Sequence, residues 1–187
     1  MTNITKDLDK IKDRISDPDF LANKGLSNEL GIHIFCYDPK YEITVRDFIK
    51  RISSDTSANY RIIVQDMYDI FIEILTEKRI IDSMPGIEEK RGKKYLLTYL
   101  QNNIAKPQAF LEKMRYDPHE PGRDILFLTG VGKVYPFMRA HIMLNAMQAM
   151  FSDIPVLMFY PGTFNGQDLI LFNRFFDGNY YRAFNLM

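Results

Sequence analysis

Two glycine-containing turns are the parts of this chain whose residue types and spacing suggest chemistry. The first covers residues 129–134 and has the sequence Thr-Gly-Val-Gly-Lys-Val; the second covers residues 160–166 and has the sequence Tyr-Pro-Gly-Thr-Phe-Asn-Gly. Glycines before a helix N-terminus expose backbone N–H groups to an anion, and a lysine adds positive charge. This pattern indicates binding of a nucleotide or another phosphate-bearing ligand.

Neither turn matches a complete nucleotide-binding motif. A Walker A loop has four residues between its first glycine and a Gly-Lys-Ser/Thr sequence, whereas here Val134 follows the lysine and no hydroxyl stands ready for magnesium. The dinucleotide fingerprint needs a third glycine where Phe137 and Met138 stand. The alternative is a tight turn whose polar groups are satisfied inside the protein. The candidate ligand-binding residues are Thr129, Gly130, Gly132, Lys133, Arg139, Gly162 and Asp168.

No arrangement of nucleophile, base or metal ligand accompanies these turns. The sole cysteine, Cys36, lies in an apolar run without an identified base, and the chain has no Gly-x-Ser-x-Gly or His-Glu-x-x-His motif. His33 lies in the same run, so we expect a packed histidine there rather than a catalyst. His119 and Glu120 have no second cluster with which to hold a metal. We therefore expect no catalytic residue, no metal and no cofactor.

The elements that position the two turns alternate between strands and helices. Residues 125–128 and 156–160 are continuous apolar runs, which indicate strands covered on both faces in a parallel sheet. We expect a single three-layer α/β domain over residues 1–187, with a mainly parallel five-stranded sheet and helices on both faces. The expected strands are residues 32–37, 60–65, 124–129, 155–160 and 180–185.

Helical periodicity predicts the covering layers. Apolar residues at helical spacing predict helices over residues 4–16 and 41–53, and another that begins after Asp66, whose carboxylate caps it. A helical excursion separates the second and third strands, with a break at residues 84–86 and helices over 87–104 and 107–116. The other expected elements are a short helix or turn within 20–30, a crossover helix over 135–151 with Pro136 in its first turn, and a helix over 168–176.

The strand ends give the predicted turns a common location. Ligands of open α/β sheets gather outside the carboxyl ends of the strands, and both glycine turns follow such ends. Arg139 lies among apolar residues of the predicted crossover helix, where an unpaired guanidinium is costly to desolvate. We therefore expect Arg139 to make a charge-assisted contact, and Asp168 to support the same site.

Composition narrows the function classes. The 187 residues are 46% hydrophobic, enough for a substantial core. Lysine plus arginine and aspartate plus glutamate both number 24, so direct DNA binding is not expected. Residues 88–94, Glu-Glu-Lys-Arg-Gly-Lys-Lys, form either a solvated helix face or a local contact for phosphates or an acidic protein surface. The charged first residues, the single cysteine and the lack of a long apolar segment favour a cytoplasmic protein without a membrane span.

A set of short motifs is distributed over most of the chain, beginning near residues 20–29 and 35–39. The main ones are Leu128-Thr129-Gly130-Val131-Gly132, Val134-Tyr135-Pro136, Arg139-Ala140-His141, Leu144-Asn145, Phe159-Tyr160-Pro161-Gly162, Asp168-Leu169 and Asn179-Tyr180-Tyr181-Arg182-Ala183-Phe184. In this order and spacing the set resembles the BrxB family, small proteins of BREX phage-resistance systems.

The resemblance implies a cytoplasmic prokaryotic defence component that works beside the phosphatase-like PglZ, the ATPase BrxC and an adenine methyltransferase. It offers no catalytic residue to carry over. Two functions remain open: an assembly or adaptor subunit that binds PglZ-like and BrxC-like proteins, and a nucleotide- or phosphate-binding protein with its site at the glycine turns 129–134 and 160–166. Interfaces favour exposed aromatic and arginine side chains. The candidate anchors are Tyr41, Tyr95, Tyr99, Tyr116, Phe164 and Arg174.

Overall fold

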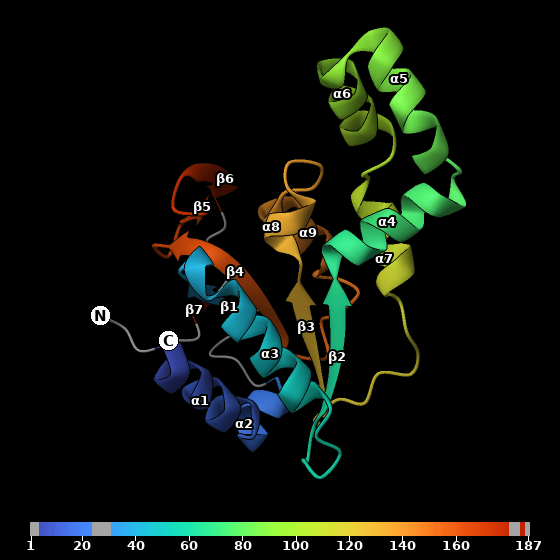
Figure 1. Ribbon diagram of the computed structural model, residues 1–187. Coiled ribbons are helices and arrows are strands. Elements are labelled where there is room, and N and C mark those ends of the chain that lie inside the picture. The colour runs from blue at the N-terminus through green and yellow to red at the C-terminus, as the bar shows by residue number, and fades with distance from the viewer. Residues whose placement is uncertain (1–3, 24–30, 180–183, 186–187) are drawn as a thin grey trace.

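The computed structural model describes residues 4–23, 31–179 and 184–185. A twisted sheet forms the middle layer, and helices lie on both of its sides (Figure 1). The predicted α/β fold class is confirmed.

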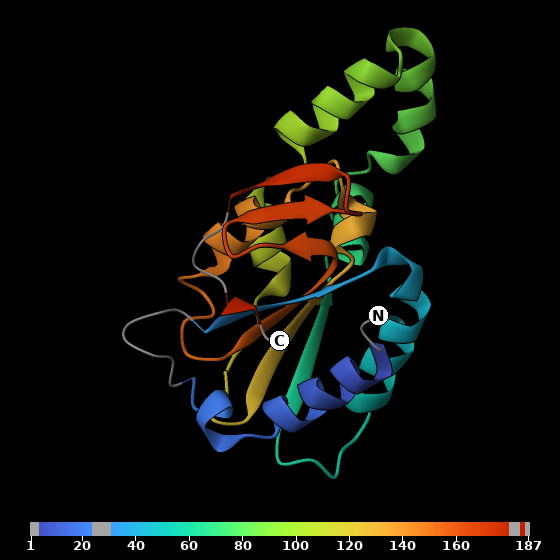
Figure 2. The same ribbon diagram turned by 90° about the vertical axis from the view of Figure 1, so that its left-hand side faces the viewer.

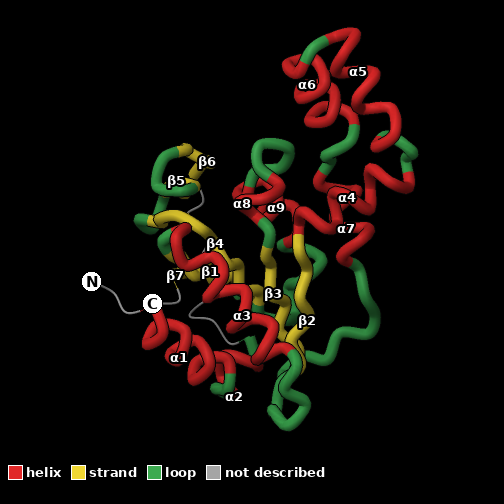
Figure 3. Tube along the Cα trace, viewed as in Figure 1, coloured by secondary structure: helices red, strands yellow, loops and turns green. Residues whose placement is uncertain are grey.

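The centre of the sheet is parallel. β1 (Ile32–Tyr37), β2 (Arg61–Asp66), β3 (Asp124–Thr129), β4 (Val156–Phe164) and β7 (Phe184–Asn185) lie in the order β2-β3-β4-β1-β7, each parallel to its neighbours (Figure 3). Their carboxyl ends therefore meet at one edge of the sheet. The expected parallel strands are present, but the whole sheet is mixed because an antiparallel ribbon extends β4.

Apolar side chains cover both faces of the sheet. On one face, Phe127 and Phe159 pack with their ring centroids 5.0 Å apart beneath α1, α2 and α3. On the other face, Ile34, Leu128 and Met158 pack against α4, α7 and α9. Full burial of one such side chain contributes about 2 kcal/mol. The bounds of these helices are Ile4–Ile15 for α1, Pro18–Leu21 for α2, Glu42–Ser53 for α3, Met67–Glu77 for α4, Pro107–Met114 for α7 and Ala140–Met147 for α9.

The helical excursion between β2 and β3 is confirmed, but its central part differs from the prediction. Instead of one helix over 87–104, α5 (Met84–Arg91) and α6 (Lys93–Asn103) form a hairpin that projects from the body of the protein (Figure 2). Gly92, with φ +82°, separates the two helices. The predicted break at residues 84–86 is wrong, because Pro85 lies in the first turn of α5, where its missing N–H breaks no bond.

The predicted crossover helix over residues 135–151 is also wrong. The short α8 (Val131–Val134) ends before this segment, residues 135–138 form turns and a bend, and α9 covers only Ala140–Met147. A proline disfavours helical geometry in the residue before it, and Tyr135 has a ψ of 138°. Pro136 therefore lies between two helices rather than in the first turn of one.

The predicted helix over residues 168–176 is an antiparallel ribbon. β5 (Asp168–Leu171) pairs with the end of β4 and with β6 (Phe175–Asn179). Leu169 and Leu171 are buried and alternate with half-buried neighbours, which is the two-residue period of a strand. The turn uses φ values of 54° at Phe172 and 56° at Asn173, a region that phenylalanine rarely adopts. This unusual turn residue explains why helical periodicity was misleading here.

Two predictions extend beyond the described residues. Of the last predicted strand, 180–185, only the two residues of β7 are described, and they pair parallel to β1. Of the predicted short helix within 20–30, α2 covers the beginning, and residues 24–30 are outside the described part of the chain.

Candidate functional site

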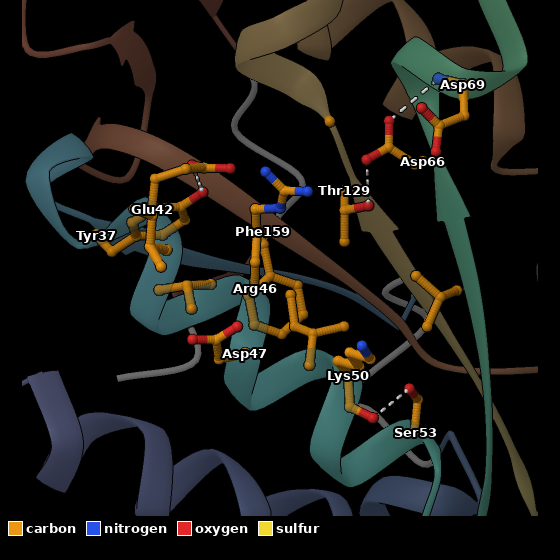
Figure 4. A pocket seen from close by; sticks show the side chains of 15 residues that line it. Tyr37, Glu42, Arg46, Asp47, Lys50, Ser53, Asp66, Asp69, Thr129 and Phe159 are labelled. Atoms are coloured by element: carbon orange, nitrogen blue, oxygen red, sulfur yellow. Dashed lines mark hydrogen bonds between the residues drawn. The ribbon is translucent and has the colours of Figure 1, made fainter.

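A crevice lies at the carboxyl edge of the sheet, between the segments that follow β1 and β3. β4 separates these two strands, and the chain leaves β1 for α3 on one face and β3 for α8 and α9 on the other. Such a divergence is the switch point at which open α/β sheets bind ligands. A cavity of about 470 Å³ lies here (Figure 4), and one of about 270 Å³ adjoins it. The two share Tyr37, Glu42, Arg46 and Gly130.

Asp66 organises one wall of the crevice. Its Oδ1 accepts hydrogen bonds from the backbone N–H groups of Tyr68, at 2.9 Å, and Asp69, at 3.2 Å, and so caps α4 as predicted. Its Oδ2 accepts a hydrogen bond from the Thr129 hydroxyl at 3.2 Å and lies 2.7 Å from the Lys133 ammonium. The lysine of the first glycine turn is therefore paired inside the protein.

Close packing accounts for the glycines without any ligand. Gly130 has φ +72°, and a Cβ there would lie 2.1 Å from Oδ1 of Asp66. A Cβ on Gly132 would lie 2.8 Å from the ring of Phe172, and a Cβ on Gly162 would lie 2.1 Å from the carbonyl oxygen of Ile170. Contacts this short force the neighbour to shift: at Gly162 that neighbour is backbone, and at Gly130 the positive φ adds strain, so these two positions need glycine for the fold itself, whereas at Gly132 the Phe172 ring could move aside.

Carboxylates outnumber cations around the larger cavity. Arg46 extends from α3 toward the end of β3 and makes no hydrogen bond or ion pair with another described residue (Figure 4). The Tyr37 hydroxyl donates a 2.6 Å hydrogen bond to Glu42, and burial and this carboxylate raise the pKa of Tyr37. An anion would be attracted by Arg46 but repelled by the acidic lining. The charged residues of the lining are Glu42, Asp47, Asp66, Asp69, Arg46 and Lys50.

The structure brings four of the predicted site residues to this crevice. Thr129 and Gly130 border the larger cavity, and Gly132 and Lys133 border the smaller one. Gly162 is buried at the end of β4 and faces β5 instead. Asp168 closes the turn between β4 and β5, where its backbone N–H donates to Asn165 Oδ1 at 2.7 Å.

Arg139 lies away from the crevice, contrary to expectation. It is exposed at the residue before α9 and makes no hydrogen bond or ion pair with another described residue, so the charge-assisted contact stays a prediction. Its expected place on the apolar face of a crossover helix is wrong, because Arg139 precedes α9 and has an extended backbone with φ −101° and ψ 142°, so helical spacing does not apply to it. The Arg139 charge still acts on the buried Asp177 carboxyl: burial raises the pKa of Asp177, and Arg139 is among the groups that oppose that rise.

Sequence reasoning missed the β1 side of the crevice. Tyr37 ends β1, so the rule that locates ligands at carboxyl strand ends would have selected it. Arg46 is in the second turn of α3, and no local pattern distinguishes it from the other charged residues of that helix. Phe159 and Phe172 reach the crevice only through the tertiary fold.

A second feature is the turn between β5 and β6, which we call the aromatic tip and define as Phe172, Arg174, Phe175 and Phe176. The exposed fractions of its phenylalanines are 39% for Phe172, 41% for Phe175 and 56% for Phe176. Large exposed aromatic side chains rarely gather on a soluble protein without a binding role. The tip was missed because the segment was predicted to be helical.

The aromatic tip is apolar on both sides of its ribbon. Successive residues of a strand point to opposite faces, so Phe175 and Phe176 lie on different sides. Phe175 stacks on Tyr135 with ring centroids 5.7 Å apart, whereas Phe176 is opposite the half-buried Ile170. The Arg174 guanidinium lies 5.9 Å from the Phe175 ring centroid. Of the candidate anchors from sequence, Arg174 and Tyr95 are exposed, and Tyr41, Tyr99, Tyr116 and Phe164 are half-buried.

Comparisons with known proteins extend over the whole chain. A family model described as BREX protein BrxB matches residues 63–186. A protein named BREX protein BrxB from Bacillus cereus (strain H3081.97) is 39% identical over 193 residues, which cover 100% of this chain and 99% of the relative. The chain belongs to the BrxB family. A BrxB protein from Escherichia coli O9:H4 (strain HS) is 32% identical over 182 residues, covering 96% of this chain and 90% of the relative. No solved structure matches the chain.

Two titratable groups of this BrxB family member, Cys36 and His33, are packed into β1. Burial raises the pKa of the Cys36 thiol to about 12, so it is not a thiolate at neutral pH. Burial and then the charge of Arg14 lower the pKa of His33 to about 4, and its ring centroid lies 4.8 Å from that of Phe20. In the part of the chain that the structure describes, no group of three or more His, Cys, Asp or Glu residues could hold a metal ion.

None of the helices in residues 4–23, 31–179 and 184–185 is both long and apolar enough to cross a bilayer.

Proposed function

We propose that this protein is a non-catalytic assembly subunit of a BREX anti-phage system and acts in the cytoplasm. It binds other BREX proteins. The favoured partner is a PglZ-like protein, and the other candidate is a BrxC-like protein. Membership of the BrxB family supports the assignment to a BREX system. The observation that carries the mode of action is the aromatic tip, where three phenylalanines within five residues are exposed.

The energetics of the tip favour a protein partner. Full burial of a phenylalanine contributes about 1.5–3 kcal/mol, and the rings of the tip, which are 39–56% exposed, gain roughly the remaining half of it when another molecule covers them. The turn is closed by a 3.0 Å hydrogen bond from the Arg174 N–H to the Leu171 carbonyl oxygen. Such ordering before binding reduces the entropy lost in the complex. The tip therefore fits an apolar pocket on a partner.

Four side chains that could act as a nucleophile or base support a role without catalysis. Cys36 and His33 are half-buried within the sheet and are held in their neutral forms at neutral pH. Lys133 and Thr129 are both bound to Asp66. Catalysis needs a nucleophile or base directed into a cavity: Cys36 and His33 line neither cavity of the crevice, and Thr129 and Lys133, which do, are engaged by Asp66.

A second candidate function is binding of a small anionic ligand, such as a nucleotide, in the crevice at the switch point. One observation favours it: Arg46 extends into the cavity without an ion pair to another described residue. It ranks second because Lys133 is already paired with Asp66 and because the carboxylates that line the cavity repel an anion.

Co-purification tests the proposed function. A tagged full-length chain is co-expressed separately with the PglZ-like and the BrxC-like protein of its own system, and captured complexes are analysed by size-exclusion chromatography. We expect a stable complex with the PglZ-like protein and no hydrolysis of phosphate esters or nucleic acid by the isolated chain. Hydrolysis by the isolated chain together with no complex would overturn the proposal.

A further inference from the structure

The hairpin formed by α5 and α6 has a groove whose chemistry differs from that of the aromatic tip. None of the residues of α5 is buried, and α6 buries only Leu96 and Leu100. The hairpin projects beyond the sheet and its covering helices (Figures 1 and 2). A hollow of about 450 Å³ is lined by residues of both helices, among them Ile87, Arg91 and Tyr95. The hairpin therefore contributes little to the hydrophobic core, and most of its side chains lie at the surface of the protein.

Aromatic contacts order the groove before any partner arrives. The Arg91 guanidinium lies 4.7 Å from the ring centroid of Tyr95, and its Nη1 donates a 2.9 Å hydrogen bond to the Tyr95 hydroxyl. The rings of Tyr95 and Tyr99 stack with centroids 6.4 Å apart and an angle of 11° between their planes. A guanidinium has five N–H donors, so most of those on Arg91 remain able to bind an acceptor. The groove therefore presents a fixed cation beside stacked aromatic rings.

The charged side chains that line the groove are all positive. Its two charged lining residues, Lys90 and Arg91, are both cations. Lys93 and Lys94 follow at the turn of the hairpin, and the Lys93 side chain is 92% exposed. Glu88 approaches Lys93 to 4.0 Å but does not line the groove. Cations beside apolar surface complement carboxylates that flank an apolar side chain.

We propose that this groove binds an acidic segment of a partner protein. Carboxylates of the segment pair with Lys90 and Arg91, and an apolar side chain of the segment packs between Ile87 and Tyr95. The inference rests on the proposed assembly role and deepens it, because a subunit that joins two proteins needs two surfaces. The aromatic tip supplies an apolar one and the hairpin groove a cationic one.

The number of cations favours an acidic protein segment over nucleic acid. Four basic residues cluster here, two acidic residues precede them, and the whole chain has no net charge. Proteins that hold duplex DNA at physiological salt neutralise roughly 6–10 phosphates. A second copy of this chain is also disfavoured, because it would bring the same cations to the contact.

Fluorescence anisotropy tests the groove directly. The probe is a short fluorescein-labelled peptide in which glutamates flank a Leu-Phe pair, and duplex DNA is titrated in parallel. The full-length chain should bind the peptide, and the double variant Lys90→Glu/Arg91→Glu should bind it about tenfold or more weakly. Arg91→Gln and Tyr95→Ser, which disturb the helices less, should each weaken binding by a smaller factor. Raising the ionic strength from about 0.1 M to about 1 M should weaken binding by the wild type, since the Debye length falls from ~10 Å to ~3 Å.

A charge-matched control separates the groove from general electrostatics. Lys6→Glu/Lys12→Glu changes the net charge equally on exposed residues of α1, and it should bind the peptide as the wild type does. Equal peptide binding by the groove variant and the wild type, no peptide binding by the wild type, or preference for DNA would each overturn the inference. In any of these cases, capture of the PglZ-like protein by the variant Lys90→Glu/Arg91→Glu would leave the proposed function intact. The opposite combination is that the groove variant loses peptide binding while the wild type captures no BREX protein. That result would support the groove as a peptide-binding site and defeat only the proposed function.

Discussion

The Lys133 ammonium lies 2.7 Å from the Asp66 carboxylate, across the end of the sheet. This ion pair occupies the lysine on which a phosphate site at the first glycine turn would depend. We therefore predict that ATP, GTP and inorganic phosphate leave the melting temperature of the protein unchanged. A ligand that binds only the folded state raises the melting temperature as its concentration increases, so differential scanning fluorimetry measures the effect.

Arg46→Ala provides the control for this titration. Arg46 is exposed and makes no hydrogen bond or ion pair with another described residue, so its removal should not unfold the protein. A saturable rise in melting temperature with ATP that Arg46→Ala abolishes would place the second candidate function first.

An ion pair at the opposite edge of the sheet, between a buried carboxylate and a partly exposed guanidinium, gives a prediction about stability. Arg61 donates two hydrogen bonds of 2.7 Å to Asp124, whose side chain is fully buried and also accepts from the Tyr116 hydroxyl at 3.0 Å. Asp124→Asn should lower the free energy of unfolding by about 2–3 kcal/mol, because hydrogen bonds to a buried charge are lost. Urea denaturation at neutral pH measures the change, and exposed Asp9→Asn should change it by less than about 0.5 kcal/mol.

The same pair predicts a pH dependence. Burial alone would raise the pKa of Asp124, but hydrogen bonds from Arg61, the Glu120 N–H and Tyr116 outweigh it and hold this pKa below its usual value. A carboxyl whose pKa is lower in the folded state contributes stability above its unfolded pKa of about 3.9 and loses it as the pH falls through the folded value. The stability difference between wild type and Asp124→Asn should therefore shrink below about pH 4. A difference that stays constant or grows on acidification would contradict this assignment.

Two glycines with positive φ offer a matched pair of substitutions. Gly130→Ala brings a Cβ within 2.1 Å of Asp66 Oδ1, whereas Gly166→Ala, at φ +95°, meets nothing within 4 Å. Gly166→Ala should cost only the backbone strain of roughly 1–2 kcal/mol, and Gly130→Ala should cost roughly 1–3 kcal/mol more because Asp66 must move. Thermal unfolding of the two variants measures the difference, and equal losses would show that Asp66 yields without cost.

The parallel centre of the fold was predictable because it depends on local patterns. The apolar runs of β3 and β4 have no two-residue alternation, which only a sheet covered on both faces tolerates. Asp66 was predictable as a helix cap because its position, between an apolar strand and a helical period, determines its bonds.

The aromatic tip and the β1 side of the crevice were not predictable because their signals are tertiary. Phenylalanine rarely adopts a positive φ, so nothing in the sequence indicated that Phe172, with φ 54°, begins the turn between β5 and β6. Arg46 resembles every other exposed charge of α3 until β3 and β4 are placed beside it. The exposure of Phe176 likewise depends on which side of the ribbon the core covers.

The most direct measurement of the central claim is the affinity of the PglZ-like protein for tip variants, determined by isothermal titration calorimetry. Phe176→Ser should weaken binding about 10–100-fold, the equivalent of about 1.4–2.7 kcal/mol of lost apolar burial. Ile43→Ser removes a 73%-exposed apolar side chain from α3 and serves as the matched control, with unchanged affinity expected. Binding of the PglZ-like protein that is equally tight for wild type, Phe175→Ser and Phe176→Ser would contradict the account.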